Sequence, residues 1–185
     1  MTITHAIEKA ESRTGLTTIW RIATQADAAD IARIYNQGIA ERIATYETEP
    51  RSPAEIAARI GEKGARHPMI VVERGGQVLA WAGAAATSTR ACYAGVADHS
   101  VYVDQGARGQ GLGRVALEAI IEEYARRGFW KLVSRIFPEN APSLALHRSC
   151  GFRVVGVFKK HARLDGKWRD TVIVERLLGA AADET

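Results

Sequence analysis

The residues best suited to chemistry lie in one glycine-rich segment, Arg108-Gly109-Gln110-Gly111-Leu112-Gly113, between an expected strand and an expected helix. A glycine-rich turn that opens a helix presents several backbone N–H groups in one direction, and the positive end of the helix dipole adds to them. Because glycine has no Cβ, a pyrophosphate can approach such a turn closely. The segment therefore predicts a phosphate-binding cradle, and a plain tight turn is the alternative that remains open.

Two other phosphate-binding motifs do not fit this segment. A dinucleotide fingerprint needs GxGxxG after the first strand of an α/β unit, but here Gly111 and Gly113 are followed by Val115 and Ala116, later in the chain. A phosphate loop would end in Gly-Lys-Ser/Thr, which is absent. The pattern thus favours neither a Rossmann dehydrogenase nor a P-loop nucleotidase.

The helix that must carry this cradle is the clearest in the chain. We expect it over residues 112–127, where Leu112, Ala116 and Ala119 recur on one face and Gly128 stands at the position of a C-cap. Because the segment before it, residues 99–104, has the composition of a strand, the cradle should lie at the end of a strand.

The other expected elements show either the hydrophobic periodicity of a helix or that of a strand. Helices should begin near Thr24, at Ser52-Pro53 and at Asn140, each on a capping signal. The remaining expected strands are 19–23, 69–73, 77–83, 131–136, 153–160 and 168–176. This order predicts an α/β (α+β) protein with a mixed central sheet and helices on both faces. We expect one domain over 18–178, a polar extension over 1–17 and a short tail over 179–185.

Composition limits the classes of function. The 185 residues are 46% apolar and 25% charged, with a net charge of +4, which is a globular balance. No run of basic residues with interleaved aromatics favours nucleic acid, and no 18-residue apolar stretch favours a membrane. Cys92 and Cys150 form no CxxC pair and no signal peptide is apparent, so we expect a cytoplasmic protein without disulfides.

Further residues recur in order around the cradle: Val101-Tyr102-Val103 before it, then Asn140, Ser143, His147 and Gly151-Phe152. This set resembles the acetyl-CoA signature of the GNAT N-acetyltransferases, Arg/Gln-x-x-Gly-x-Gly/Ala, and the resemblance covers about residues 19–178. It implies the GNAT acyl-CoA N-acyltransferase fold, with a mostly antiparallel sheet of about seven strands, and acetyl-CoA as cosubstrate without a metal.

The resemblance also implies cofactor-binding roles. The backbone from Arg108 to Arg114 would hold the pyrophosphate. The main chain of Val101-Tyr102-Val103 would meet the pantetheine arm and the thioester carbonyl, where a fixed N–H stabilises the charge that develops on oxygen. Asn140 and Ser143 would lie beside the cofactor. Asn140 is equally well explained as a helix N-cap, and the two roles can coexist.

Acetyl transfer needs a base for the amine and an acid for the departing thiolate. Asp98 alternates with Ser100 and Tyr102 onto one face of the strand, where the most similar branch usually has Glu, so the resemblance implies a base that acts through a water. His147 would protonate the thiolate, since an imidazole exchanges protons near neutral pH. The alternatives without a catalytic role are that Asp98 is a solvated carboxylate at a strand end and that His147 only packs. Cys92 and Cys150 are better explained as small fillers than as acyl carriers.

The branch that the sequence most resembles is that of the phosphinothricin acetyltransferases, which includes enzymes for methionine sulfoximine and arsinothricin. Arg90, Tyr93 and Tyr46 would bind the substrate, with the Arg90 fork on a carboxylate or phosphinate. The branch often carries a second basic residue two positions earlier, but here that residue is Ser88, so methionine sulfone or sulfoximine becomes comparably plausible. A role in detoxification or resistance and a homodimer follow from the same resemblance.

Two other functions stay open at this point. A protein or peptide N-acetyltransferase would share the cradle but need an open groove for a peptide. A non-catalytic acyl-CoA-binding module would keep the cradle and lose the acid and the base, against which Asp98 and His147 both argue.

Overall fold

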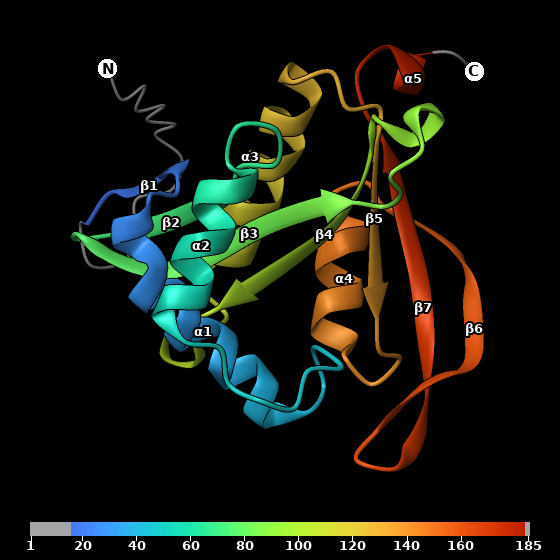
Figure 1. Ribbon diagram of the computed structural model, residues 1–185, viewed down its shortest axis with the longest axis horizontal. Helices are drawn as coiled ribbons and strands as arrows, with labels where there is room; N and C mark the ends of the chain where they lie inside the picture. The colour runs from blue at the N-terminus through green and yellow to red at the C-terminus, as the bar shows by residue number, and fades with distance from the viewer. Residues whose placement is uncertain (1–15, 184–185) are drawn as a thin grey trace.

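Seven strands form one sheet in the order β1-β2-β3-β4-β5-β7-β6 in the computed structural model, which describes residues 16–183 (Figure 1). Neighbouring strands are antiparallel except β4 and β5, which are parallel. The strands are β1 Thr18–Ile22, β2 Ile70–Arg74, β3 Gln77–Ala86, β4 Val96–Val103, β5 Lys131–Ile136, β6 Arg153–Leu164 and β7 Lys167–Leu177. The expected mixed, mostly antiparallel sheet is confirmed. The expected polar extension lies outside the described residues except for 16 and 17.

The helices begin where their capping residues predict. The Asp27 carboxylate accepts the Thr24 N–H at 2.7 Å, and Ser52 and Glu55 form a reciprocal capping box with Pro53 in the first turn. Left-handed Gly128 and Gly151 follow α3 and α4. The helices are α1 Ala28–Glu41, α2 Pro53–Lys63, α3 Leu112–Arg126, α4 Ala141–Ser149 and the short α5 Ala180–Asp183.

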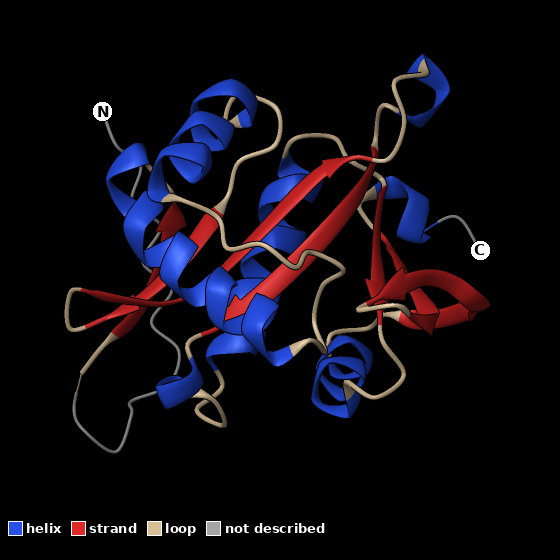
Figure 2. Ribbon diagram, turned by 60° about the horizontal axis from the view of Figure 1, so that its bottom comes forward, coloured by secondary structure: helices blue, strands red, loops and turns tan. Residues whose placement is uncertain are grey.

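The two faces of the sheet carry separate apolar cores, and helices cover both (Figures 1 and 2). On one face α1 and α2 pack Ile31, Ile34 and Ile56 against Val71 and Trp81. On the other face α3 supplies the residues that pack on β1 to β5 and β7, among them Leu112, Ala116, Leu117, Ile120 and Tyr124. Because β4 is buried from both sides, the side chains that alternate along it reach two different environments.

The one parallel pair in the sheet is short. β4 and β5 pair only from Val96↔Lys131 to Asp98↔Val133, although β4 continues to Val103 and β5 to Ile136. Beyond Asp98 the two strands separate, and the Ser134 hydroxyl donates to the His99 carbonyl at 3.0 Å at the start of the gap. This separation leaves a gap between β4 and β5 in the middle of the sheet.

Candidate active site

The glycine-rich segment has the backbone that its residue types predict. Gly109 and Gly111 have φ values of +74° and +80°, and a Cβ added at either would meet nothing within 4 Å. Gly111 is the N-cap of α3, so the first N–H groups of the helix, which have no acceptor within it, face outward from the turn. A Cβ at Gly113 would lie 3.2 Å from Leu146 and 3.3 Å from Val103. Glycine at this position therefore keeps the space between α3, β4 and α4 open.

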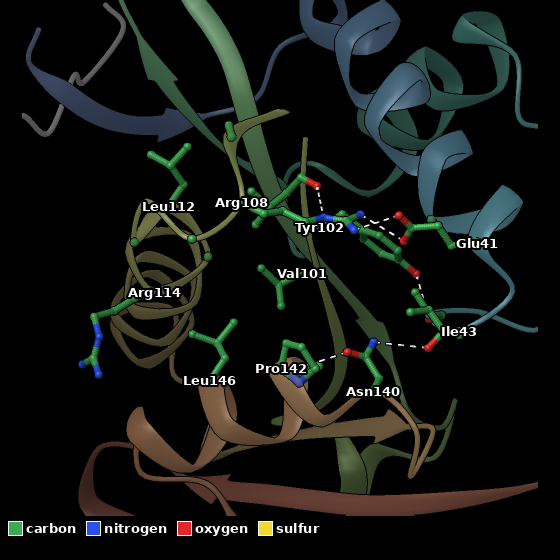
Figure 3. Close-up of a pocket in the computed structure, with 18 residues that line it drawn as sticks. Glu41, Ile43, Val101, Tyr102, Arg108, Leu112, Arg114, Asn140, Pro142 and Leu146 are labelled. Atoms are coloured by element: carbon green, nitrogen blue, oxygen red, sulfur yellow. Dashed lines mark hydrogen bonds and ion pairs between the residues drawn. The ribbon is translucent and has the colours of Figure 1, made fainter. Parts of the chain in front are cut away.

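A cavity of about 440 Å³ lies in front of this turn (Figure 3). Of the twelve predicted cofactor-binding residues, only Gln110 is missing from its lining. The Gln110 side chain instead accepts a hydrogen bond of 2.6 Å from Arg74. The lining contains Gly38, Glu41, Ile43, Ala44, Val101, Tyr102, Val103, Ala107, Arg108, Gly109, Gly111, Leu112, Gly113, Arg114, Asn140, Pro142, Ser143 and Leu146.

The charged side chains of this cavity are held by partners of opposite charge. Arg108 forms two hydrogen bonds with the Glu41 carboxylate, at 2.7 and 3.0 Å, which lowers the pKa of Glu41 (Figure 3). Arg114 pairs with Glu118 at 3.2 Å, so its guanidinium points away from the cavity. Of these two arginines, Arg108 is therefore the one whose guanidinium stays at the cavity wall, beside Glu41.

A second cavity, of about 220 Å³, lies on the α1–α2 face of the sheet. Asp98, Ser100 and Tyr102 share it, as period two predicted. An oxygen of Asp98 lies 2.6 Å from Arg135 but receives no aligned hydrogen bond from the described residues. Trp81 is 4% exposed, and its Nε1–H likewise has no acceptor among the described residues. The lining is Tyr35, Arg59, His67, Met69, Trp81, Gly83, Ala84, Ala85, Asp98, Ser100 and Tyr102.

A small third cavity of about 40 Å³ occupies the gap between β4 and β5 and adjoins the other two. Tyr102 lines all three cavities, and Ser100 lines the second and third. The Tyr102 ring stacks on Trp81 at 4.8 Å between centroids, and burial raises the pKa of its hydroxyl. The sheet therefore places an acidic side chain on one side of the gap and the phosphate cradle on the other.

Asn140 performs the capping role and also faces the cavity. Its Oδ1 accepts the Ser143 N–H at 3.2 Å, and its Nδ2 donates to the Ile43 carbonyl in the loop after α1. Asn140 and Ser143 line both the first and third cavities. The prediction that Asn140 caps a helix is confirmed.

His147 is buried at the inner wall of the third cavity, next to a second histidine that the sequence analysis did not single out. The Nε2 atoms of His147 and His99 are 3.0 Å apart, and the Phe152 ring packs against both imidazole rings. His99 occupies the alternate face of β4 from Asp98. A histidine among Ala97, Val101 and Val103 on an inward face was the signal that could have found it.

The structure does not bring the three predicted substrate-binding residues into these cavities. Arg90 and Tyr93 lie together on the exposed turn before β4, with the guanidinium 5.8 Å from the ring centroid. The Tyr46 hydroxyl bonds Thr171 at 2.7 Å, and its ring packs on Phe137. Their role toward a substrate stays a prediction.

The chain that forms this site is similar to proteins of a known family. The family model described as "Acetyltransferase (GNAT) family" matches residues 33–152, which span the cradle, Asp98 and His147. This chain belongs to the GNAT acetyltransferase family. The seven-stranded sheet, split between β4 and β5 with acyl-CoA-type glycines at the start of α3, is its fold in this chain.

Individual GNAT relatives cover most of the chain. A phosphinothricin N-acetyltransferase of Alcaligenes faecalis is 33% identical over 86% of this chain and 82% of its own length. An L-methionine sulfoximine/L-methionine sulfone acetyltransferase of Pseudomonas aeruginosa is 31% identical over 84% and 91%. The structure of a GNAT superfamily phosphinothricin acetyltransferase from Sinorhizobium meliloti, in complex with acetyl-CoA, superposes with a TM-score of 0.83 at 31% identity, covering 91% of this chain and 92% of that one.

None of the described helices is both long and apolar enough to cross a bilayer.

Proposed function

We propose that this GNAT protein transfers the acetyl group of acetyl-CoA to the α-amine of a small amino-acid-like substrate, of the phosphinothricin, arsinothricin or methionine sulfoximine and sulfone type. One observation carries the proposal. The small cavity between β4 and β5 shares lining residues with the cavity in front of the cradle and with the cavity that holds Asp98, and Tyr102 lines all three. Two substrates bound from opposite faces would therefore meet in that gap, as direct transfer requires.

The cradle residues fit the phosphates of acetyl-CoA. The outward N–H groups at the start of α3 provide donors, the helix dipole favours an anion, and Gly109 and Gly111 leave room for close approach. Arg108 adds a positive charge at the cavity wall. The main chain of Val101, Tyr102 and Val103 would hold the pantetheine arm, and Asn140 and Ser143 would lie beside it. The bound cosubstrate supplies an activated acetyl group.

Asp98 would assist removal of the amine proton. The Asp98 side chain lines the second cavity together with Ser100, and Arg135 lies 2.6 Å from one of the Asp98 carboxylate oxygens. Because aspartate is one methylene shorter than the glutamate usual in this branch, we propose that a water carries the proton between amine and carboxylate. On the other side of the gap, His147 would supply the proton for the sulfur that leaves.

The polar tail of the substrate has two sets of candidate partners. Within the second cavity, Arg59 and the Nε1–H of Trp81 can donate to carboxylate, phosphinate or sulfone oxygens. Arg90 and Tyr93 lie on the turn before β4 and would close over a bound substrate from the outside. The volume of about 220 Å³ suits a single amino acid better than an extended peptide.

Two variants test the assignment of base and acid. In Asp98→Asn and in His147→Phe, acetyl-CoA should still bind with its wild-type Kd, while kcat for acetylation of the amine should fall on the order of 10²-fold or more. Glu122→Gln, which changes an exposed carboxylate of α3 outside the cavity linings, serves as the matched control and should keep wild-type turnover. Wild-type turnover in either active-site variant would remove that residue from the mechanism.

We also propose that the protein is a homodimer in which the β6–β7 hairpin meets a second copy. β6 is an edge strand, and its exposed apolar residues Val154, Val155, Val157 and Phe158 continue into a hollow of about 440 Å³ lined by Leu144, Phe152 and Val174. Contiguous apolar surface of this kind on a soluble enzyme marks an interface. Sedimentation should give a dimer for wild type and a monomer for Val157→Lys; a wild-type monomer would contradict the proposal.

The cellular setting is part of the same proposal. Cys92 is an exposed free thiol and Cys150 a buried one, which suits a reducing cytoplasm. Acetylation removes the positive charge from a glutamate-like inhibitor, so the activity would confer resistance to such compounds. Expression in a sensitive bacterial host should raise the tolerated concentration of phosphinothricin or methionine sulfoximine, and the Asp98→Asn variant should not.

A further inference from the structure

The pair His99–His147 contains more hydrogen-bond contacts than a neutral pair has protons. His99 Nδ1 faces the Val133 carbonyl at 2.9 Å, His147 Nδ1 faces the Ser143 carbonyl at 2.8 Å, and the two Nε2 atoms face each other at 3.0 Å. Each contact is attractive only if a proton lies in it, because two lone pairs at these distances repel. Three contacts need three protons, and two neutral imidazoles carry two.

The pair is neutral at rest because it is out of water. His99 is 3% exposed and His147 1% exposed, and the Phe152 ring packs on both. Burial is the main cause that lowers the pKa of both rings, that of His99 to about 3. One of the three contacts is therefore without its proton.

The partners determine which nitrogen lacks it. Among the described residues, His99 Nδ1 has only the Val133 carbonyl as a partner, so it keeps its proton. His147 Nδ1 has a second partner, the Ser143 hydroxyl at 3.4 Å, which can donate to it. Every arrangement of two protons leaves one contact unprotonated, and this costs least at His147 Nδ1, where the Ser143 hydroxyl can donate instead. The second proton then lies on His147 Nε2, pointing at His99, and His147 Nδ1 is unprotonated beside Ser143.

We propose that His99 is a positioning residue that holds the proton of His147 on Nε2, and so makes Nδ1 of His147, beside Ser143, the atom at which the pair exchanges a proton with the cofactor side of the site. The proposal rests on the proposed acetyl transfer and extends it. Ser143 lines both the cradle cavity and the gap, whereas His147 lines only the gap. Ser143 is then the last link between the ring and the sulfur.

The proton balance closes without any further reactant. As the C–N bond forms, the amine gives up one proton; as the C–S bond breaks, Ser143 Oγ donates its proton to the departing sulfur. The proton that the amine loses to Asp98 is passed through water to His147 Nδ1, which is unprotonated at rest, and from there to the Ser143 oxygen. While it holds this extra proton, the pair has all three of its hydrogen bonds. His99 Nε2 accepts a hydrogen bond from His147 Nε2–H throughout, so His147 Nε2 keeps its proton and takes no part in this exchange.

The test reads the tautomer of His147 directly. Nitrogen-15 shifts of the imidazole rings report which nitrogen carries the proton, and with five histidines in the chain His147→Phe suffices to assign its signals. In the wild-type protein His147 should be the Nε2–H tautomer. In His99→Leu, with no acceptor left for Nε2, the proton should move to Nδ1 to meet the Ser143 carbonyl. His99→Gln, whose amide oxygen can take the place of Nε2, should restore the Nε2–H form.

A matched control separates hydrogen bonding from packing. Phe152→Leu alters the contact with both rings but no hydrogen bond, so the tautomer of His147 should not change. With acetyl-CoA and amine present, His99→Leu should lower kcat on the order of tenfold or more at unchanged acetyl-CoA Kd, and His99→Gln should recover most of it.

An Nδ1–H tautomer in wild type, unaffected by His99→Leu, would overturn the proposal. A tautomer that moves as expected in a protein that acetylates no amine would instead contradict the proposed function and leave the hydrogen-bond assignment in place.

Discussion

Arg108 and Glu41 form a bidentate ion pair across the wall of the cradle, with Nη1 and Nη2 of the arginine 2.7 and 3.0 Å from the two carboxylate oxygens. Gln105 adds a third hydrogen bond to Glu41 at 2.8 Å. The pair ties the last residue of α1 to the turn before α3. It also means that Arg108 must share its charge between Glu41 and any phosphate in the cradle.

Glu41→Gln should therefore strengthen acetyl-CoA binding. Removing the carboxylate takes away a negative charge near the phosphates and frees Arg108, and for a partly exposed pair we expect about a two- to fivefold lower Kd by calorimetry. Glu122→Gln removes the same charge from an exposed position of α3 outside the cavity lining and should have little effect. Weaker binding in Glu41→Gln would show that Glu41 positions Arg108 rather than competing for it.

Gly113→Val should block the cradle without unfolding the protein. A Cβ here already lies 3.2 to 3.3 Å from Leu146 and Val103, and the added methyl groups would enter the cavity that both residues line. We expect acetyl-CoA affinity to fall at least tenfold while the melting temperature changes by a few degrees. Gly61→Val, at a glycine of α2 where an added Cβ would meet only the end of the Gln25 side chain, is the matched control. Unchanged affinity in Gly113→Val would place the cofactor elsewhere.

The sequence predicted the elements of this site better than the contacts between them. Local signals determine where helices begin, so the capping residues Ser52 and Asn140 and the cradle glycines were found in advance. Period two also placed Asp98 with Ser100. The same alternation puts His99 on the opposite face, but its partner His147 comes from a helix 48 residues later, and no local pattern encodes that distance.

Side chains on turns were the least predictable part. Arg90 lies on a short exposed turn whose position no periodicity specifies, and Gln110 turns toward Arg74 of β2 because that strand lies beside the cradle in the folded sheet. For Gln110, a tertiary neighbour decides the direction of the side chain.

The buried histidines should make stability depend on pH in acid. Their pKa values are lowered in the folded state, so the unfolded chain binds more protons below about pH 6.5 and the free energy of unfolding falls as pH drops toward about 3. His99, whose pKa is lowered to about 3, contributes a slope of up to about 1.4 kcal/mol per pH unit between about pH 6.5 and that value. Denaturant titrations from pH 7 to 4 should show this slope and a shallower one in His99→Leu. Equal slopes would mean that His99 titrates normally.

Replacing Arg59 and replacing Arg90 should have different effects on the KM of the amine substrate. If the tail of the amino acid lies in the second cavity, Arg59→Ala should raise its KM at least tenfold while acetyl-CoA binding stays unchanged. Arg90→Ala should do the same only if the turn before β4 closes over the bound substrate. Arg126→Ala, an exposed arginine at the end of α3 that lines none of the three cavities, is the control. An unchanged KM in both variants would move the substrate out of this cavity.

The most direct measurement of the central claim is free thiol release from acetyl-CoA by the purified protein against a panel of amines. The panel holds phosphinothricin, arsinothricin, methionine sulfoximine, methionine sulfone, the common amino acids, a polyamine and a lysine-containing peptide. We predict rapid release with one or more of the glutamate-like or methionine-derived amino acids, together with an N-acetylated α-amine in the product. Release with the peptide alone, or with none of the amines despite measurable acetyl-CoA binding, would contradict the account.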